Sequence, residues 1–589
     1  MITAIHITHE ARAKMGGIGS VLEGLITAEP YQRVVDRTLL VGTAELPLED
    51  PPPDLVSVLY ESNGAGAGPG RPEAAAAPLL REIERAYGVR VFYGQRALTG
   101  PLGGRRAVVD LLLLDVRQAH AAPVNDLKGE LFHRFGLRSD RFEHDWAYEE
   151  WVRVAMPALG AVGAYLGGAT DGAVLASHEF MGLPALLAAR IHLPDLKTVY
   201  WAHEVPPVRD LIEGRPDHRL RFDLALGTES GRRAYEDLLR EETTFKHALV
   251  SRAHAAHAVF AVSDRVAAEL RLLGPAFGAT PLEIVYNGLP AHGADLGRCQ
   301  ASRRRLLDYA EALVGFRPDF LFTHVTRPVV SKAIGRDLAV LEQLDPLLGE
   351  RGRTAVLLIL ATDGGRRDPD LVCRMEREYG WPLFHRMGWP DLVKGEVEVG
   401  LAVQRHNEAA RATRAVLINQ FGLRPYDCGN RVPADLVFAD LRRGSDVEFG
   451  QSTYEPFGIS PLEVLAFGGI SVITRSCGCT RLLERLTGNR LPANVLIADY
   501  AAPLAAVAEA SRDADADRIE REVAGAVARE LLERLPTDPA GFARLLEAGA
   551  RLAEQMSWRA VCEDHFLPAL ERCLGLKRPP RPQAVSLVH

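Results

Sequence analysis

Short apolar runs alternate with longer helical patterns along most of this chain, and that alternation restricts the possible folds more than any other feature. The runs are rich in β-branched residues and apolar on both faces, as expected for parallel strands that helices cover on each side. The alternation therefore predicts βαβ units and an α/β fold with two doubly wound, Rossmann-like domains. The predicted strands are Ile2–Thr8, Thr38–Gly42, Ala107–Val116, Ala173–Ser177, Thr198–Ala202, Ala258–Val262 and Glu283–Tyr286 in the first half, and Phe320–Thr326, Ala355–Ala361, Ala415–Asn419, Val447–Phe449, Ile470–Thr474 and Asn494–Ala498 in the second.

The length of the chain, 589 residues, is sufficient for two large domains that each have a buried core. A helical stretch rich in arginine and leucine ends at Gly315–Pro318, directly before the strongest strand of the second half. This change predicts a boundary near residues 305–318, with a first domain at residues 1–310 and a second domain from residue 311. The basic, proline-rich tail at residues 577–589 is predicted to be mobile.

The charge balance excludes some classes of function. The chain has 69 Lys and Arg against 77 Asp and Glu, for a net charge of −8 without any long basic run. This balance argues against a protein that coats nucleic acid or an anionic membrane. The first residues lack a basic region and an apolar segment of secretory type, and no segment is a good membrane span. The chain has seven cysteines, an odd number, which suits a reducing cytoplasm. Together, these features lead us to expect a cytoplasmic protein without a membrane span and without a nucleic-acid partner.

A glycine-rich turn follows the first predicted strand and precedes an apolar helical pattern. Its residues run from Lys14 through Gly16 and Gly17 to Ser20. Ser20 is predicted to cap the helix, with Glu23 completing a capping box, and the glycines let a ligand approach backbone N–H groups at the helix start. Phosphate is the natural ligand of such a turn, although a tight turn that requires positive φ explains the glycines equally well. Neither a Walker loop nor a dinucleotide fingerprint is present.

A second candidate site lies in the segment Tyr454–Glu463, which carries two carboxylates eight positions apart, Glu455 and Glu463. Ser460 is predicted as a helix N-cap, so the turn that includes Gly458 and Ile459 would present N–H groups to an anion. From helix chemistry alone, a capping role for Glu463 and a surface role for Glu455 are the simpler interpretation. The preceding strand favours a binding site, because ligands of open α/β sheets gather at the carboxyl ends of strands.

These motifs together resemble the retaining glycosyltransferases with two Rossmann-like domains, the GT-B group, and are most similar to glycogen and starch synthases. The resemblance spans roughly residues 1–575 in order and implies a cleft between the two domains. It also implies that the second domain ends at residue 555 and that residues 556–576 form a helix that crosses back to the first domain. The motifs that carry the resemblance are Glu455–Glu463, Lys14–Gly17, Arg327 and Lys332 in TRPVVSK, Val285–Gly288, His178–Glu179, Trp201–Glu204 and Met556–Val561.

The resemblance implies a role for each matching residue. Arg327 and Lys332 would neutralise the diphosphate of a nucleotide sugar, where negative charge accumulates in the transition state. Glu455 would hold hydroxyls of the donor sugar, and His203 would lie beside that sugar. The remaining residues implied to face the donor are Lys14, Gly16, Gly17, Asn287, Gly458, Ile459, Ser460 and Glu463, with Glu463 on the ribose.

The activity implied by the resemblance is transfer of glucose from ADP- or UDP-glucose to the nonreducing end of an α-1,4-glucan, with neither a metal ion nor another cofactor. Three alternatives remain open at this point. The same fold serves transferases with a small-sugar, lipid or other polysaccharide acceptor. It also suits a non-catalytic regulator that binds glucan or nucleotide. Periodicity alone would permit an NAD-linked enzyme, although the dinucleotide fingerprint is missing.

Overall fold

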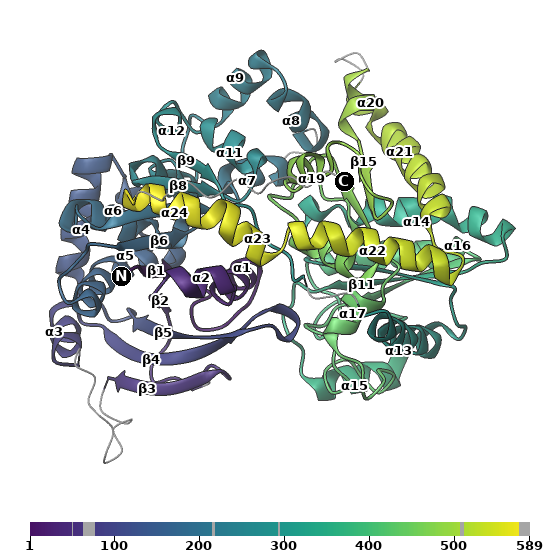
Figure 1. Ribbon diagram of the computed structural model, residues 1–589, viewed down its shortest axis with the longest axis horizontal. Helices are drawn as coiled ribbons and strands as arrows, with labels where there is room; N and C mark the ends of the chain where they lie inside the picture. The colour runs from purple at the N-terminus through teal and green to yellow at the C-terminus, as the bar shows by residue number, and fades with distance from the viewer. Residues whose placement is uncertain (50, 63–76, 215–217, 292–294, 507–511, 577–589) are drawn as a thin grey trace, which may run out of the picture.

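The computed structural model describes residues 1–49, 51–62, 77–214, 218–291, 295–506 and 512–576, and its strands form two sheets (Figure 1). The first sheet has the strand order β3-β4-β5-β2-β1-β6-β7-β8-β9, and the second has the order β12-β11-β10-β13-β14-β15. The predicted α/β fold with two parallel-sheet units is confirmed, whereas the tail predicted at residues 577–589 lies outside the described residues. The strands are β1 Thr3–Ile7, β2 Arg37–Thr43, β3 Leu55–Glu61, β4 Arg90–Thr99, β5 Arg106–Asp115, β6 Ala173–His178, β7 Lys197–Ala202, β8 Ala258–Ala261, β9 Leu282–Ile284, β10 Phe320–Thr326, β11 Ala355–Ala361, β12 Thr413–Ile418, β13 Val447–Gly450, β14 Ile470–Thr474 and β15 Val495–Ala498.

Strands β3 and β4 were not predicted, and they are the antiparallel part of the first sheet. β4 pairs antiparallel with β5 and with β3, while β5, β2, β1, β6, β7, β8 and β9 are parallel to one another. The residues of β3 are only partly buried, and β4 alternates buried with partly buried positions. Because these strands form one edge of the sheet, they lack the continuous apolar run that identifies a central parallel strand.

The second sheet is buried on both faces. Alternate residues of β11 enter two different clusters, with Leu357 on one face and Leu358 on the other. Helices α14 and α21 cover the first of these faces, and α13, α15 and α17 cover the second. A strand buried on both sides needs apolar residues at every position, which is why the sequence AVLLILA identifies β11 so clearly.

The helices before the second sheet are α1 Gly17–Ile26, α2 Glu29–Val34, α3 Ala77–Tyr87, α4 Ala121–Phe135, α5 Trp146–Leu166, α6 Leu183–His192, α7 Pro206–Gly214, α8 His218–Leu226, α9 Glu229–Leu238, α10 Phe245–Val250, α11 Asp264–Arg271, α12 Ala276–Ala279 and α13 Leu296–Val314. The later ones are α14 Ile334–Glu350, α15 Pro369–Tyr379, α16 Gly395–Ala409, α17 Phe438–Gly444, α18 Ile459–Leu462, α19 Thr480–Thr487, α20 Ala501–Ala505, α21 Arg512–Arg534, α22 Pro539–Gln555, α23 Trp558–Val561 and α24 Leu567–Leu574. None of the described helices is both long and apolar enough to cross a membrane.

The C-terminal helices connect the two halves of the molecule. In Figure 1, α22 lies beside the second sheet, and α23 and α24 continue across to the first, all in yellow. Phe566, between α23 and α24, stacks on Trp201 of β7 with ring centroids 5.6 Å apart. At the crossing point, a Cβ atom on Gly288 would lie 2.6 Å from the indole of Trp558, so only glycine leaves room for that ring. This packing brings the second sheet against the loops of the first.

Candidate active site between the two sheets

The loop after β13 lies directly against loops of the first sheet. The hydroxyl of Tyr454 accepts the backbone N–H of Val205 at 3.0 Å and donates to Glu269 Oε2 at 3.0 Å. The hydroxyl of Ser263 donates to the carbonyl of Pro456 at 2.6 Å. Val205 follows β7, and Ser263 follows β8, so the carboxyl ends of strands from both sheets meet at the Tyr454–Pro456 loop. This is the position where ligands bind in open α/β sheets.

One carboxylate at this contact has an unusual ionisation. Glu269 is fully buried in α11, and burial raises its pKa to about 7. The guanidinium of Arg265, with Nε 2.8 Å from Glu269 Oε1, and the Tyr454 hydroxyl oppose that rise by stabilising the charged form. Arg265 also donates to the carbonyl of Ser476 at 2.7 Å, so the cluster joins α11 to a second loop of the other sheet.

Lys332 and Glu455, predicted as separate binding groups, form an ion pair at this contact. The Nζ of Lys332 lies 2.6 Å from Glu455 Oε2, and the two side chains are 17% and 18% exposed. The backbone holds the pair together, because the N–H of Thr453 donates to the carbonyl of Ser331 at 2.8 Å. Arg327 lies on the same loop after β10 but is exposed, and its side chain makes no ion pair with any described residue.

Glu463 and Ser460 contact a buried arginine, Arg442. The Nε of Arg442 lies 2.7 Å from Glu463 Oε2, and its Nη2 donates to the Ser460 hydroxyl at 2.7 Å. Ser460 donates in turn to the carbonyl of Val325 at 3.0 Å. The prediction that Ser460 caps the helix is wrong: the short helix α18 begins at Ile459, and Gly458 occupies the cap position. Arg442, which the sequence did not single out, fixes the orientation of both side chains.

Gly458 is required by two features of the backbone. Its φ is +91°, a conformation that L-amino acids rarely adopt, and a Cβ there would lie 2.6 Å from Cys477 Sγ. The N–H of Gly478 donates to the carbonyl of Glu455 at 2.9 Å, so the loops that carry Glu455 and Cys477 run side by side. Cys477 is a free, buried thiol, as is Cys479.

The glycine-rich turn holds a carboxylate of the protein itself. Glu10 Oε2 accepts the backbone N–H groups of Met15 and Gly16 at 2.7 and 2.6 Å, and Glu10 is buried. Lys14 is exposed and pairs with Glu23 at 2.9 Å. Helix α1 begins at Gly17, which is also exposed, so the prediction that Ser20 caps this helix is wrong. In the sequence, Glu10 is marked only by its position, as an acidic residue between the first predicted strand and the turn.

His203 follows β7, and a buried glutamate fixes its position. The carboxylate of Glu179, after β6, accepts the backbone N–H of His203 and that of Glu204, the latter at 2.7 Å. Glu179 has a φ of +57°, which is strained for a residue with a side chain, and strain of this kind often marks functional loops. Burial and the neighbouring charge of Glu204 raise the pKa of Glu179 well above its usual value.

Three histidines meet at the ends of neighbouring strands. His203 Nε2 lies 2.8 Å from His178 Nδ1, and His178 Nε2 lies 2.9 Å from His6 Nδ1. Burial lowers the pKa of His6 to about 4 and that of His203 to about 3, so both are neutral at pH 7. His6 was not predicted as a site residue, because a single histidine inside a strand gives no sequence signal.

Asn287 lies in the turn that meets the C-terminal crossing. It is buried, and its Oδ1 has no hydrogen-bond partner among the described residues. Two residues later, the N–H of Leu289 donates to the carbonyl of Met556 at 2.8 Å. A buried amide oxygen without a partner is unusual and is consistent with a polar ligand nearby.

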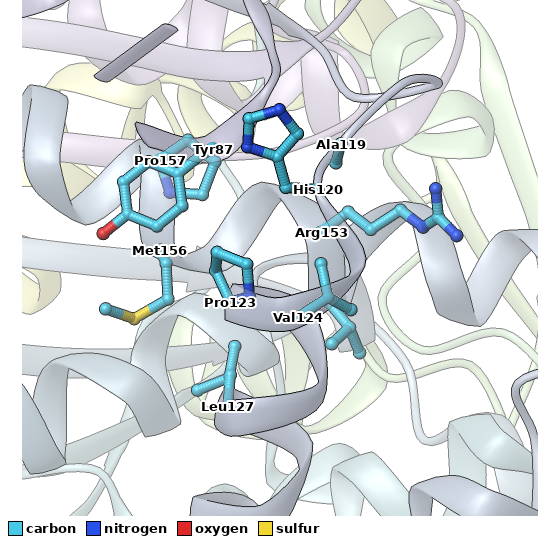
Figure 2. A pocket seen from close by; sticks show the side chains of 10 residues that line it. Tyr87, Ala119, His120, Pro123, Val124, Leu127, Arg153, Met156 and Pro157 are labelled. Atoms are coloured by element: carbon cyan, nitrogen blue, oxygen red, sulfur yellow. The ribbon is translucent and has the colours of Figure 1, made fainter. Parts of the chain in front are cut away.

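A separate pocket lies in the first half, between the end of α3, the start of α4 and the middle of α5 (Figure 2). It shares no residue with the site described above, and in Figure 1 its helices lie on the side of the first sheet away from the second. Within the described ranges, no group of three or more His, Cys, Asp or Glu side chains is arranged to hold a metal ion.

Comparisons with known proteins agree on the fold. No protein-family model and no curated protein matches this sequence. Among solved structures, the catalytic domain of starch synthase IV from Arabidopsis thaliana matches with a TM-score of 0.51 at 14% identity, over 98% of this chain and 99% of that one. An α,α-trehalose-phosphate synthase from Burkholderia xenovorans matches with a TM-score of 0.50 at 12% identity, over 97% and 100%. The chain therefore has the GT-B glycosyltransferase fold.

Proposed function

We propose that this protein is a retaining glycosyltransferase that transfers glucose from ADP- or UDP-glucose to the nonreducing end of an α-1,4-glucan. The observation that carries the proposal is the Lys332–Glu455 ion pair, which lies where the loops of both sheets meet. Glu455 directly precedes Pro456, whose carbonyl accepts the Ser263 hydroxyl of the first sheet, and it directly follows Tyr454, whose hydroxyl accepts the N–H of Val205 in the His203 loop. A cation, a carboxylate and a neutral histidine thus lie on loops that follow different strands and contact one another.

Each group has a chemical task in this proposal. Lys332 would exchange its contact with Glu455 for the donor diphosphate, whose negative charge increases as the bond to the sugar breaks. Arg327, exposed on the same loop, would supply a second positive charge, and Lys14 and the amide of Gly17 would face the donor from the first domain. Released from Lys332, Glu455 would orient the sugar hydroxyls, while Glu463, held by Arg442, would bind the ribose.

The transfer would take place on one face of the sugar. The acceptor hydroxyl oxygen forms a bond to the anomeric carbon as the bond from that carbon to the phosphate oxygen breaks. The departing phosphate oxygen accepts the proton of the hydroxyl, so the configuration is retained without a metal ion or a protein base. His203 would lie beside a hydroxyl of the donor sugar, in the cleft between the two domains.

The structural neighbours support the donor more than the acceptor. The starch synthase was solved with ADP and acarbose, which favours a nucleotide donor and a glucan acceptor. The trehalose-phosphate synthase was solved with glucose-6-phosphate, and its fold matches about equally well. A transferase with a small phosphorylated sugar as acceptor is therefore the second candidate.

The test is release of ADP or UDP from a panel of nucleotide sugars, with glycogen, with glucose-6-phosphate and without acceptor. We expect release from one glucose donor that glycogen stimulates. Glu455→Ala should lower kcat by about 100-fold or more, because it removes a group that positions the reacting sugar. Glu408→Ala, an exposed glutamate on α16, is the matched control and should leave kcat unchanged.

The outcomes separate the candidates. Stimulation by glucose-6-phosphate instead of glycogen would replace the glucan acceptor with a phosphorylated sugar. Near-normal turnover in Glu455→Ala would contradict the role of Glu455. Binding of a nucleotide sugar with neither hydrolysis nor transfer would favour a non-catalytic regulator.

A further inference from the structure

A continuous line of hydrogen-bonding groups runs from His203 into the core of the first sheet. His203, His178 and His6 come from the neighbouring strands β7, β6 and β1. Beyond His6, its Nε2 lies 3.4 Å from the hydroxyl of Tyr31, which lies 2.9 Å from the hydroxyl of Thr38. His6, His178, Tyr31 and Thr38 are all buried, so bulk water does not reach the line.

The number of protons in this line is fixed by its surroundings. Burial lowers the pKa of His6 and His178, and for His178 the neighbouring histidines contribute in the same direction, so each inner ring is neutral and carries one N–H. Each contact between two rings needs one donor and one acceptor. A neutral imidazole provides one of each, so every ring in the line must point its N–H in the same direction.

Only two arrangements satisfy both contacts between the rings. In the outward arrangement, Tyr31 donates to His6 Nε2, His6 Nδ1–H donates to His178, and His178 Nδ1–H donates to His203 Nε2. His203 then carries its proton on Nδ1. In the inward arrangement every donor is reversed, His203 carries its proton on Nε2, and His6 donates to Tyr31.

The end of the line favours the outward arrangement. A phenol is a stronger acid than a neutral imidazole, so the Tyr31 O–H is the better donor and the imidazole nitrogen the better acceptor at that contact. The Thr38 hydroxyl lies where it can donate to the Tyr31 oxygen at 2.9 Å and complete the sequence. The Nδ1 of His203 is hydrogen-bonded to no other group in the described part of the chain.

We propose that Tyr31, His6 and His178 form a buried relay that fixes the tautomer of His203, so that its Nδ1 presents an N–H donor to the ligand. The three are positioning residues, since they act through His203 and do not touch the ligand. The identity of that ligand, a hydroxyl of the donor sugar, rests on the proposed function. The relay itself rests only on the geometry and burial of its members.

The test reads the tautomer of His203 directly, without substrate. The full chain is labelled with ¹⁵N in its histidine rings, and two-bond ¹H–¹⁵N correlations at pH 7.5 distinguish an Nδ1–H ring from an Nε2–H ring. His203→Gln assigns the signals. In the unmodified protein we expect mainly the Nδ1–H tautomer of His203.

Two variants interrupt the relay and one control does not. Tyr31→Phe removes the terminal donor, and the net worth of one hydrogen bond predicts that the ratio of Nδ1–H to Nε2–H falls about two- to twelvefold. His6→Phe breaks the line one step closer and should reduce the ratio similarly. Trp201→Phe is the matched control, because Trp201 stacks beside His178 and His203 but its indole N–H has no partner among the described residues.

The results separate the relay from the proposed function. An unchanged ratio in both Tyr31→Phe and His6→Phe, or an Nε2–H tautomer in the unmodified protein, would refute the relay. A ratio that falls as much in Trp201→Phe would show that ring packing, not hydrogen bonding, sets the tautomer. The tautomer is measured without substrate, so the result does not depend on the proposed function. A separate finding that the protein has no transferase activity would contradict the proposed function and leave the relay intact.

Discussion

Replacing Tyr454 by phenylalanine removes one oxygen atom that joins the loops of the two sheets. That oxygen accepts the N–H of Val205 and donates to Glu269, both at 3.0 Å, and all three residues are buried. A buried amide without a partner costs about 1–3 kcal/mol. At pH 8, above the pKa of about 7 that burial gives Glu269, a lost hydrogen bond to its carboxylate costs about 1.5–3 kcal/mol. We therefore expect Tyr454→Phe to lower the free energy of unfolding by about 3 kcal/mol.

Calorimetry measures this effect as a fall of about 2–5 °C in the unfolding midpoint, the smaller value if the whole chain unfolds together and the larger if one half unfolds by itself. Tyr309→Phe is the matched control, because Tyr309 is equally buried in α13 and its hydroxyl has no partner among the described residues. The same substitution there should be neutral or slightly stabilising. If Tyr454→Phe is no more destabilising than Tyr309→Phe, the hydroxyl does not connect the loops as described.

Two further substitutions test the site. Burial lowers the pKa of His6 from 6.5 to about 4, so between these pH values the unfolded chain binds more protons than the folded one. The stability that neutral His6 allows is therefore fully present above pH 6.5 and is lost as the pH falls towards 4. The loss of stability amounts to about 2 kcal/mol at pH 5. Calorimetry at pH 7.5 and pH 5 should therefore show that His6→Phe loses less stability on acidification than the unmodified protein; an equal loss would contradict this assignment. Gly458→Ala should destabilise the protein by about 2–4 kcal/mol through strain and overlap with Cys477 Sγ. Adding Cys477→Ala should relieve the overlap but not the backbone strain. If the stability losses of the two single variants simply add up in the double variant, the overlap does not contribute.

The strands that were predicted best are those whose environment is the same along their whole length. The bounds of β10, β11 and β14 agree with the predicted runs, because each strand is buried on both faces over all or most of its length and consists mainly of apolar and β-branched residues. β3 and β4 were missed for the opposite reason. Their side chains are partly exposed at one edge of the sheet, so polar residues interrupt the pattern.

The structure brings some of the predicted site residues together, corrects two predicted helix caps and leaves other predicted roles untested. Lys332 and Glu455 were chosen separately, and the structure places them 2.6 Å apart. The helix caps at Ser20 and Ser460 were wrong, because a cap depends on the φ and ψ angles of one residue, which nearby glycines changed. The roles assigned to Lys14 and Asn287 remain predictions.

The sequence alone determined the α/β class, most of the parallel strands and the motif residues Glu455 and Lys332. These follow from periodicity and residue type, which depend on neighbours a few positions away. Only the tertiary structure decided that Arg442 holds Glu463 and that His6, His178 and His203 form one line. Such contacts depend on the order of strands in a sheet and on the packing between sheets, and residues far apart in the chain carry no local pattern that reveals them.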